Sequence, residues 1–225
     1  TEDSASGTTE DSARSTTEDS STSAAEESVN DAAEDIAARR AVRRHELRDE
    51  WGVPQEAFVI GVIGRLVRIK GVDIVIRALP QILKANPKAH LVIIGSGPEE
   101  TALRLLTTQL GLKRHITFTG FRRDIADCMR AIDCFASASL SEGLGLNVLE
   151  AMSSELPVAV TGVGGILDIT QHGVNGLIVA PRSSDDLADA IITLMQQPEY
   201  AARLARKARE HVIRRFSLDS MTQRT

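Results

Sequence analysis

The sequence predicts an α/β protein with a doubly wound, parallel, Rossmann-like sheet, preceded by an acidic tail that we expect to be disordered. Two observations after Pro54 predict this fold: short apolar runs recur along the chain, and longer amphipathic segments separate them. Because strands that are apolar on both faces need helices on both faces, this alternation indicates a parallel sheet covered on each side. A length of 225 residues with 42% hydrophobic content suits one sizeable globular domain.

The elements follow one another in a regular order. A first helix is favoured by the Ala, Arg and Glu content of residues 32–50 and is expected to end at Gly52 and Pro54. The six apolar runs expected to form strands are residues 58–64, 90–94, 116–119, 134–138, 158–161 and 177–179. The amphipathic segments expected to form helices are residues 72–84, 99–110, 125–131, 146–153, 184–196 and 199–214.

The first 35 residues repeat with a period of eight, and acidic pairs begin at residues 2, 10, 18, 26 and 34. No bulky apolar side chain occurs before Val29 and Ile36, so this segment cannot bury enough surface to offset its ordering entropy. We expect it to be disordered, although an eight-residue period also suits a weak helical array. The predicted organisation is therefore a tail at 1–35, a helix and linker at 36–54 and a Rossmann-like domain at 55–225.

The charge is unevenly distributed along the chain. Residues 1–38 hold eleven acidic residues against Arg14 alone, so they contribute −10 to the formal net charge of −5 and leave about +5 for the rest. A mildly basic folded part suits a protein that binds phosphorylated ligands, and it equally suits ordinary surface charge.

Composition argues against several classes of protein. Cys128 and Cys134 suit neither a zinc site nor a disulfide scaffold, so we expect reduced, structural thiols. The five histidines are scattered without ligand spacing, and no metal site is expected. Neither a run of eighteen apolar residues nor a signal segment occurs, so we expect no membrane span and a cytoplasmic location. The first residue is Thr1, as in a fragment or a processed product.

Two cations flank the loop after the first expected strand. Gly64 and Arg65 close that strand, and Lys70 and Gly71 open the following helix, at the edge of the sheet where such folds bind ligands. A cation near a helix N-terminus is unfavourable by about 0.3–1 kcal/mol, and an anionic ligand would reverse that sign. The Arg65 fork and the Lys70 point charge are suited to phosphate oxygens; two solvated surface cations are the alternative.

A glycine-rich segment, residues 141–147, follows the fourth expected strand and leads into a helix that contains Glu150. Gly143 and Gly145 let the backbone approach a ligand closely, and the free N–H groups of the new helix form an anion site that suits a diphosphate. Glu142 and Glu150 are expected to reach different parts of one elongated ligand. The alternative is a glycine-rich turn followed by a helix-stabilising glutamate.

A second glycine pair, Gly95 and Gly97, follows the second expected strand. It lacks the third glycine of a dinucleotide-binding fingerprint, and the acidic residues that follow would repel a pyrophosphate. We therefore interpret this segment as a turn, with Pro98 at the first helical position.

Six motifs occur in the order seen in retaining glycosyltransferases of family 4, and the chain resembles that family from roughly Trp51 to Phe216. They are GRLVRIKG, IIGSGPE, FTGF, SEGLGLNVLEAM, PVAVTGVGGI and NGLIVAP, and they extend over about 120 residues. The pair Glu142 and Glu150 is the most specific of these signals. The resemblance implies a GT-B fold, of which this chain is the C-terminal, donor-binding half.

The resemblance also implies roles for individual residues. Arg65 and Lys70 would bind the donor diphosphate and neutralise the leaving group, and Glu142 would hold hydroxyls of the transferred sugar. Glu150 would accept hydrogen bonds from the ribose. The remaining donor-binding positions supply backbone groups or flank the base, and they are Gly64, Phe121, Arg122, Gly143, Leu144, Gly145, Leu146 and Asn147.

The activity implied by the resemblance is transfer of a sugar from a UDP-, GDP- or ADP-sugar to an acceptor hydroxyl, with retention and without a metal or other cofactor, in polysaccharide or glycolipid synthesis. The family's N-terminal acceptor domain is not in this sequence, so we expect it as a separate part or partner, through which the protein would associate peripherally with a membrane. No nucleic-acid partner is expected.

Two departures from the family pattern stand out. Glu155 occupies a position where the family usually has Gly, and Asp168 one where Glu is expected. A non-catalytic nucleotide-sugar-binding module, or a subunit of a split enzyme, is the alternative to a transferase. A phosphorylase or a sugar-nucleotide epimerase with the same two-domain plan is a further one.

Overall fold

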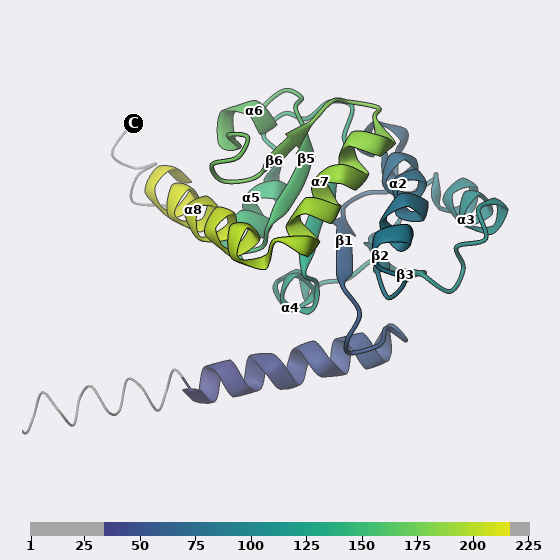
Figure 1. Cartoon of the computed structure of the whole chain (residues 1–225), viewed down its shortest axis with the longest axis horizontal. Helices are drawn as coiled ribbons and strands as arrows, with labels where there is room; N and C mark the ends of the chain where they lie inside the picture. Colours follow the sequence, from purple (N-terminus) through teal and green to yellow (C-terminus); the bar gives the residue numbers. More distant parts are fainter. Residues whose placement is uncertain (1–33, 217–225) are drawn as a thin grey trace, which may run out of the picture. The chain divides into compact units, whose positions relative to one another are not determined.

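The structure is a computed structural model that describes residues 34–216 (Figure 1). The predicted tail lies outside the described residues except for Glu34 and Asp35, which already belong to a helix at residues 34–50. The chain divides into two compact units, Thr1–Val42 and Arg43–Thr225. The second unit contains all the strands found within residues 34–216 and every predicted site residue.

Six parallel strands form one sheet in the order β3-β2-β1-β4-β5-β6, which confirms the predicted doubly wound fold. Every residue of β1, β2, β4 and β5 is buried, which is why these strands read as continuous apolar runs. The strands are β1 (Val59–Ile63), β2 (His90–Ile94), β3 (Ile116–Gly120), β4 (Cys134–Ser137), β5 (Val158–Thr161) and β6 (Leu177–Val179).

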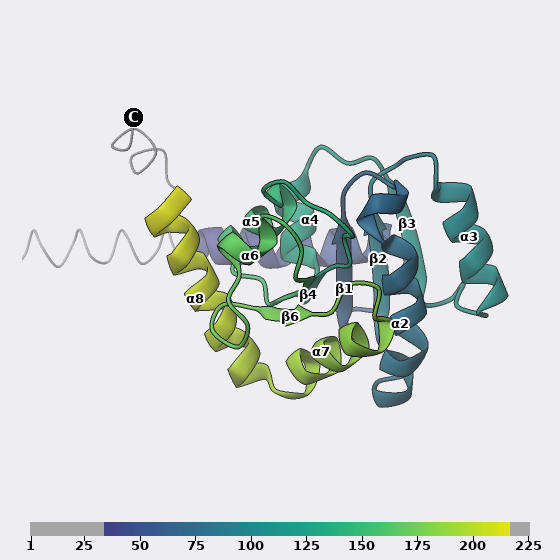
Figure 2. The same cartoon turned by 90° about the horizontal axis from the view of Figure 1, so that it is seen from above.

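Helices cover both faces of the sheet, and Figure 2 shows α2 and α7 on one side with α4 and α5 on the other. Each face has its own apolar cluster, and α8 contributes to both. None of the helices within residues 34–216 is long and apolar enough to cross a bilayer. The helices are α2 (Val72–Ala85), α3 (Glu100–Gln109), α4 (Ile125–Ala131), α5 (Leu146–Ser153), α6 (Ile166–Ile169), α7 (Ser184–Gln196) and α8 (Pro198–Phe216).

The compact unit begins at Arg43, whereas the sequence placed the start of the domain at residue 55. The reason is a buried cation that sequence periodicity does not reveal. Arg48 is 2% exposed and donates to the carbonyls of Ala131 at 2.9 Å and Ala57 at 3.1 Å, and to the Asp133 carboxylate at 2.8 Å. Because a buried cation is costly unless it is paired, these contacts hold the end of the helix within the domain.

The other predicted elements end within two residues of their observed bounds. Two short pieces were missed, the 3₁₀ helix η1 (Arg68–Lys70) and α6, because each is too short to show a periodicity. The prediction that Pro98 is the first helical residue is wrong. The helix α3 begins at Glu100, whose N–H donates to the Gly97 carbonyl at 3.1 Å, so Pro98 lies in the preceding turn.

Candidate functional site

The carboxyl ends of the six strands lie at one edge of the sheet because every strand pair is parallel. The neighbours β1 and β4 continue in opposite directions across the sheet, so the loops that follow them diverge. The loop after β1 carries Arg65 and Lys70, and the loop after β4 carries Glu142. The charged residues predicted from separate motifs therefore gather at the topological switch point, where doubly wound folds bind ligands.

Backbone contacts join these two loops. Leu140 donates its N–H to the carbonyl of Ile69 at 2.7 Å, and Gly71 lies directly against Ala138. Lys70, between Ile69 and Gly71, is thereby held beside the loop that leads to Glu142. The tight η1 turn that the sequence missed is what brings the cation to this position.

Lys70 and Glu142 form an ion pair at the centre of the site. The Lys70 ammonium bonds the Oε1 atom of Glu142, and the side chains are 25% and 10% exposed. The hydroxyl of Ser139 donates to the same carboxylate oxygen at 2.8 Å. Sequence reasoning assigned no role to Ser139, whose position on the chain gives no signal beyond its being close to Glu142.

The glycine-rich loop, predicted to bind an anion, leads directly into the N-terminus of α5. Gly145 has a φ of 71° and immediately precedes α5, as the N-cap of that helix. A second loop supports it from behind: the N–H of Gly165 donates to the Glu142 carbonyl at 3.1 Å, and a Cβ on Gly165 would lie 1.9 Å from the Gly143 carbonyl oxygen. The glycines after β5 thus fix the loop after β4, with the first N–H groups of α5 at its end.

Asn147, predicted to bind the donor, uses its side chain within the protein. Its Nδ2 donates to the Ile63 carbonyl at 2.9 Å, and its Oδ1 accepts the N–H of Val148 at 3.0 Å. The side chain therefore bridges the end of β1 and the first turn of α5. Any contribution to a ligand falls to its backbone or to the geometry that this bridge maintains.

A cavity of about 500 Å³ lies beside the switch point, at the ends of β1, β2 and β3. Gly64, Arg65 and Arg122 line it together with Phe121, whose side chain is 71% exposed. The turn from Gly95 to Pro98 also lines this cavity, although the sequence predicted only a turn there and no contact with a ligand. The position of this turn could have indicated a place in the site, because it directly follows β2, the strand next to β1. A cavity of this size suits a small organic ligand.

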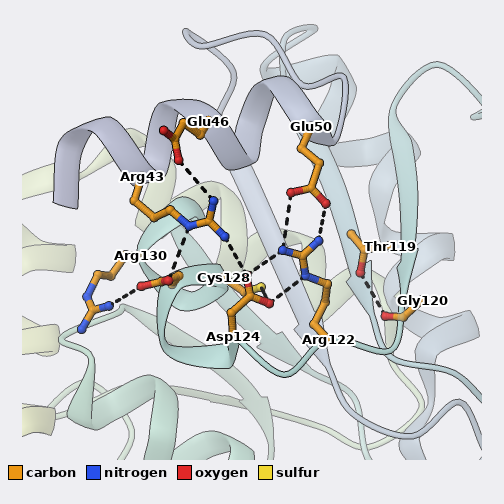
Figure 3. A network of polar contacts seen from close by, with 10 residues as sticks. Arg43, Glu46, Glu50, Thr119, Gly120, Arg122, Asp124, Cys128 and Arg130 are labelled. Atoms are coloured by element: carbon orange, nitrogen blue, oxygen red, sulfur yellow. Dashed lines mark hydrogen bonds and ion pairs between the residues drawn. The ribbon is translucent and has the colours of Figure 1, made fainter. Parts of the chain in front are cut away.

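The guanidinium of Arg122 is occupied by carboxylates, as Figure 3 shows. Its Nε donates to Asp124 Oδ1 at 2.8 Å, and it also pairs with Glu50 at the end of the first helix. Arg43 adds a further contact to Asp124 at 2.9 Å. The hydrogen bonds from Arg122 lower the pKa of Asp124 to about 2. Arg122 thus ties the cavity rim to the first helix.

The remaining predicted residues are distributed around this centre. Gly64, Arg65, Lys70 and Asn147 line one narrow crevice, whereas the exposed Glu150 on α5 lines neither hollow. Leu144 and Leu146 are 45% and 65% exposed. Residues 34–216 contain no group of three or more His, Cys, Asp or Glu side chains placed to share a metal ion.

The model of the family described as Glycosyl transferases group 1 matches residues 43–211. The chain is 34% identical over 187 residues to the GDP-mannose-dependent alpha-(1-6)-phosphatidylinositol monomannoside mannosyltransferase of Mycobacterium tuberculosis, covering 79% of this chain and 48% of that protein. The chain thus spans about half the length of the curated relatives that it matches.

Solved structures show the same relationship. The Anabaena HepE complex with UDP and glucose superposes with a TM-score of 0.76 at 32% identity, covering 81% of this chain and 50% of that one. The C-terminal domain of the glycosyl transferase group 1 family protein LpcC from Francisella tularensis gives a TM-score of 0.71 at 30% identity, covering 78% of this chain and 93% of that domain.

Proposed function

This chain belongs to the glycosyl transferases group 1 family, and from that premise we propose that it is the donor-binding half of a retaining, family 4 glycosyltransferase. Its ligand would be a nucleotide diphosphate sugar. The observation that carries the proposal is the gathering of Arg65, Lys70 and Glu142 beside a glycine-rich loop at the switch point of the sheet. One relative is named for its use of GDP-mannose, and another was crystallised with UDP, so the donor class is supported and the base stays open.

In this proposal, each part of the nucleotide sugar contacts a different group of residues at the carboxyl edge of the sheet. Arg65 and Lys70 hold the diphosphate, with the N–H groups at the start of α5 beside them. Glu142 accepts hydrogen bonds from the sugar hydroxyls, and the exposed Glu150 accepts them from the ribose. The cavity rimmed by Phe121 receives the nucleobase, consistent with its volume of about 500 Å³.

The transfer step would be driven by charge stabilisation. The bond between the acceptor oxygen and the anomeric carbon forms as the bond from that carbon to the diphosphate oxygen breaks, and the electron pair leaves with the diphosphate. The acceptor proton passes to an oxygen of the departing diphosphate. Arg65, Lys70 and the loop amides stabilise the charge that develops there, so these cations would serve in place of a metal ion.

Calorimetric titration of this chain with UDP, GDP and ADP tests the proposal. We expect one nucleotide to bind, and replacing Arg65 and Lys70 together by Ala to weaken binding by about a hundredfold, since hydrogen bonds to charged groups contribute about 1.5–3 kcal/mol. Glu150→Ala should weaken it by about tenfold. Lys88→Ala is the matched control, because Lys88 precedes β2 at the opposite edge of the sheet. A folded chain that binds none of the three at millimolar concentration would refute the proposal.

A second candidate is a donor-binding module that does not turn over without an acceptor-binding partner. The observation that favours it is a set of exposed large apolar side chains on the loops and helical turns that follow the strands at the carboxyl edge: Ile69, Phe121, Leu144, Leu146 and Leu167, each at least 45% exposed. A second domain or subunit would cover them. Nucleotide binding without release of nucleotide from the bound sugar would support this candidate, and release by this chain alone would contradict it.

A further inference from the structure

Ser139, two residues after the end of β4, is completely buried although its side chain is polar. Buried hydroxyl groups in proteins almost always have a hydrogen-bond partner. The partner here is Glu142 Oε1 at 2.8 Å, and because an ionised carboxylate has no hydrogen to donate, the Ser139 hydroxyl is the donor. The hydroxyl of Ser139 is therefore directed at one atom of the candidate site.

The sheet holds Ser139 in place. Thr161, which is fully buried at the end of β5, donates its hydroxyl to the Ser139 carbonyl at 2.6 Å. The hydroxyl of Ser137, at the end of β4, lies 3.3 Å from that of Ser139. Ser137 and Thr161 are buried at the ends of two interior strands, so they hold Ser139 rigidly. Glu142, in contrast, belongs to a loop.

We propose that Ser139 is a positioning residue that fixes the carboxylate of Glu142, and through it the ammonium of Lys70. Within the described part of the chain, the contacts of this carboxylate fall on Oε1, which leaves Oε2 to accept a hydroxyl from the ligand. The contact itself stands on the geometry. Its consequence for binding a nucleotide sugar rests on the function proposed above.

The physical argument concerns direction and entropy. An ammonium is a point charge that attracts a carboxylate without fixing its orientation, whereas a hydroxyl on a rigid strand end does fix it. Without that hydroxyl, Glu142 would sample more rotamers, and binding a sugar would have to order it. The diphosphate depends less on this orientation, because Arg65 and the backbone amides of the proposed site hold it besides Lys70. Loss of the hydroxyl therefore affects the sugar more than the nucleotide.

The first test needs no ligand. The rate of acetylation of Lys70 by acetic anhydride is measured by mass spectrometry in the whole chain, with the exposed Lys88 as internal reference. Ser139→Ala should raise the relative rate at Lys70 by about threefold, because a less ordered carboxylate protects the amine less. Glu142→Gln, which removes the charge of the partner, should raise it at least as much. An unchanged rate in Ser139→Ala would overturn the proposal.

Matched variants separate positioning from general loosening. Ser137→Ala removes a neighbouring buried hydroxyl that does not touch Glu142, and Ser141→Ala removes an exposed one from the same loop. Ser141→Ala should leave the rate at Lys70 unchanged, and Ser137→Ala, which reaches Glu142 only through Ser139, should raise it by less than Ser139→Ala does. A rise in Ser137→Ala equal to that in Ser139→Ala would overturn the proposal. If Ser139→Ala does not fold, as judged by circular dichroism, Ser139→Cys takes its place, since a thiol keeps the shape and is a weaker donor.

The second test uses calorimetry with UDP and UDP-glucose, GDP and GDP-mannose, or ADP and ADP-glucose, according to which nucleotide the unchanged chain binds. Ser139→Ala should weaken binding of the nucleotide sugar by about tenfold and of the free nucleotide by about twofold at most. Equal losses for both would mean a merely structural role and would overturn the proposal. If the unchanged chain binds no nucleotide, the proposed function fails, whereas the acetylation rates still decide the role of Ser139.

Discussion

A Cβ atom on Gly71 would lie 2.1 Å from the carbonyl oxygen of Ala138, well inside van der Waals contact. The φ of Gly71 is 60°, a conformation that other residues rarely adopt. This contact locks the loop after β1 to the loop after β4, on either side of the Lys70–Glu142 pair.

Gly71→Ala should lower the free energy of unfolding by about 2–4 kcal/mol, because steric overlap adds to the cost of the left-handed backbone. Gly111→Ala is the matched control, since Gly111 has a φ of 71° and a Cβ atom there would meet nothing within 4 Å. The control should lose only about 1 kcal/mol. Urea denaturation measures the free energy of unfolding of both variants. Equal losses of stability would mean that overlap with Ala138 adds nothing to the cost of the substitution at Gly71.

Gly143→Ala should leave the fold intact and weaken binding of the donor. A Cβ on Gly143 meets nothing within 4 Å, so we expect a change in the free energy of unfolding of about 0.5 kcal/mol or less. The methyl group would occupy the space where the loop approaches a diphosphate, and the affinity for the nucleotide sugar should fall by about tenfold. Calorimetry decides the question: unchanged affinity in a folded variant would mean that the ligand does not contact this backbone.

Glu155→Gly should stabilise the protein. Glu155 has a φ of 59°, at the position where the sequence departs from the glycine usual in the family that it resembles. Glycine relieves the left-handed strain but loses more backbone entropy, so the expected gain is about 0.5–1 kcal/mol. Glu155→Ala removes the same charge and keeps the strain. Thermal denaturation measures the stability of both variants. If both are stabilised equally, the gain comes from removing the charge of Glu155 and not from relieving backbone strain.

Stability should decrease as the pH falls from about 6.5 to about 4, because His90 is buried in its neutral form. Burial, followed by the nearby charge of His115, lowers the pKa of His90 to about 4. Its Nε2 lies 2.9 Å from the Thr117 hydroxyl, which itself donates to the Trp51 carbonyl at 3.0 Å, so Nε2 carries the proton.

In that pH range the unfolded chain binds one more proton at this position than the folded chain, so the stability lost on acidification is about 3 kcal/mol. His90→Asn removes the titrating group and should flatten this part of the profile of unfolding free energy against pH. A variant profile that runs parallel to that of the unchanged protein would show that other groups cause the loss.

The sequence alone predicted the fold class and the order of the strands and main helices along the chain. Continuous apolar runs determined the parallel sheet, since a strand buried on both faces leaves no polar alternation. The spacing of Gly64, Arg65 and Lys70 and the glycine-rich loop before Asn147 predicted which strand ends would form the candidate site. The carboxyl ends of parallel strands lie at one edge of the sheet, so the segments that carry these motifs lie near one another.

Tertiary structure decided what each side chain does at that edge. Nothing in the sequence indicates that the hydroxyl of Ser139 donates to Glu142. Nor does it indicate that the guanidinium of Arg122 forms ion pairs with Glu50 and Asp124. The partner of Arg48, Asp133, is likewise distant along the chain. Local sequence sets the period and the conformation of each element, because those depend on near neighbours. The pairing of charged groups across loops depends on how the sheet brings distant residues together, and that is settled only when the whole domain packs.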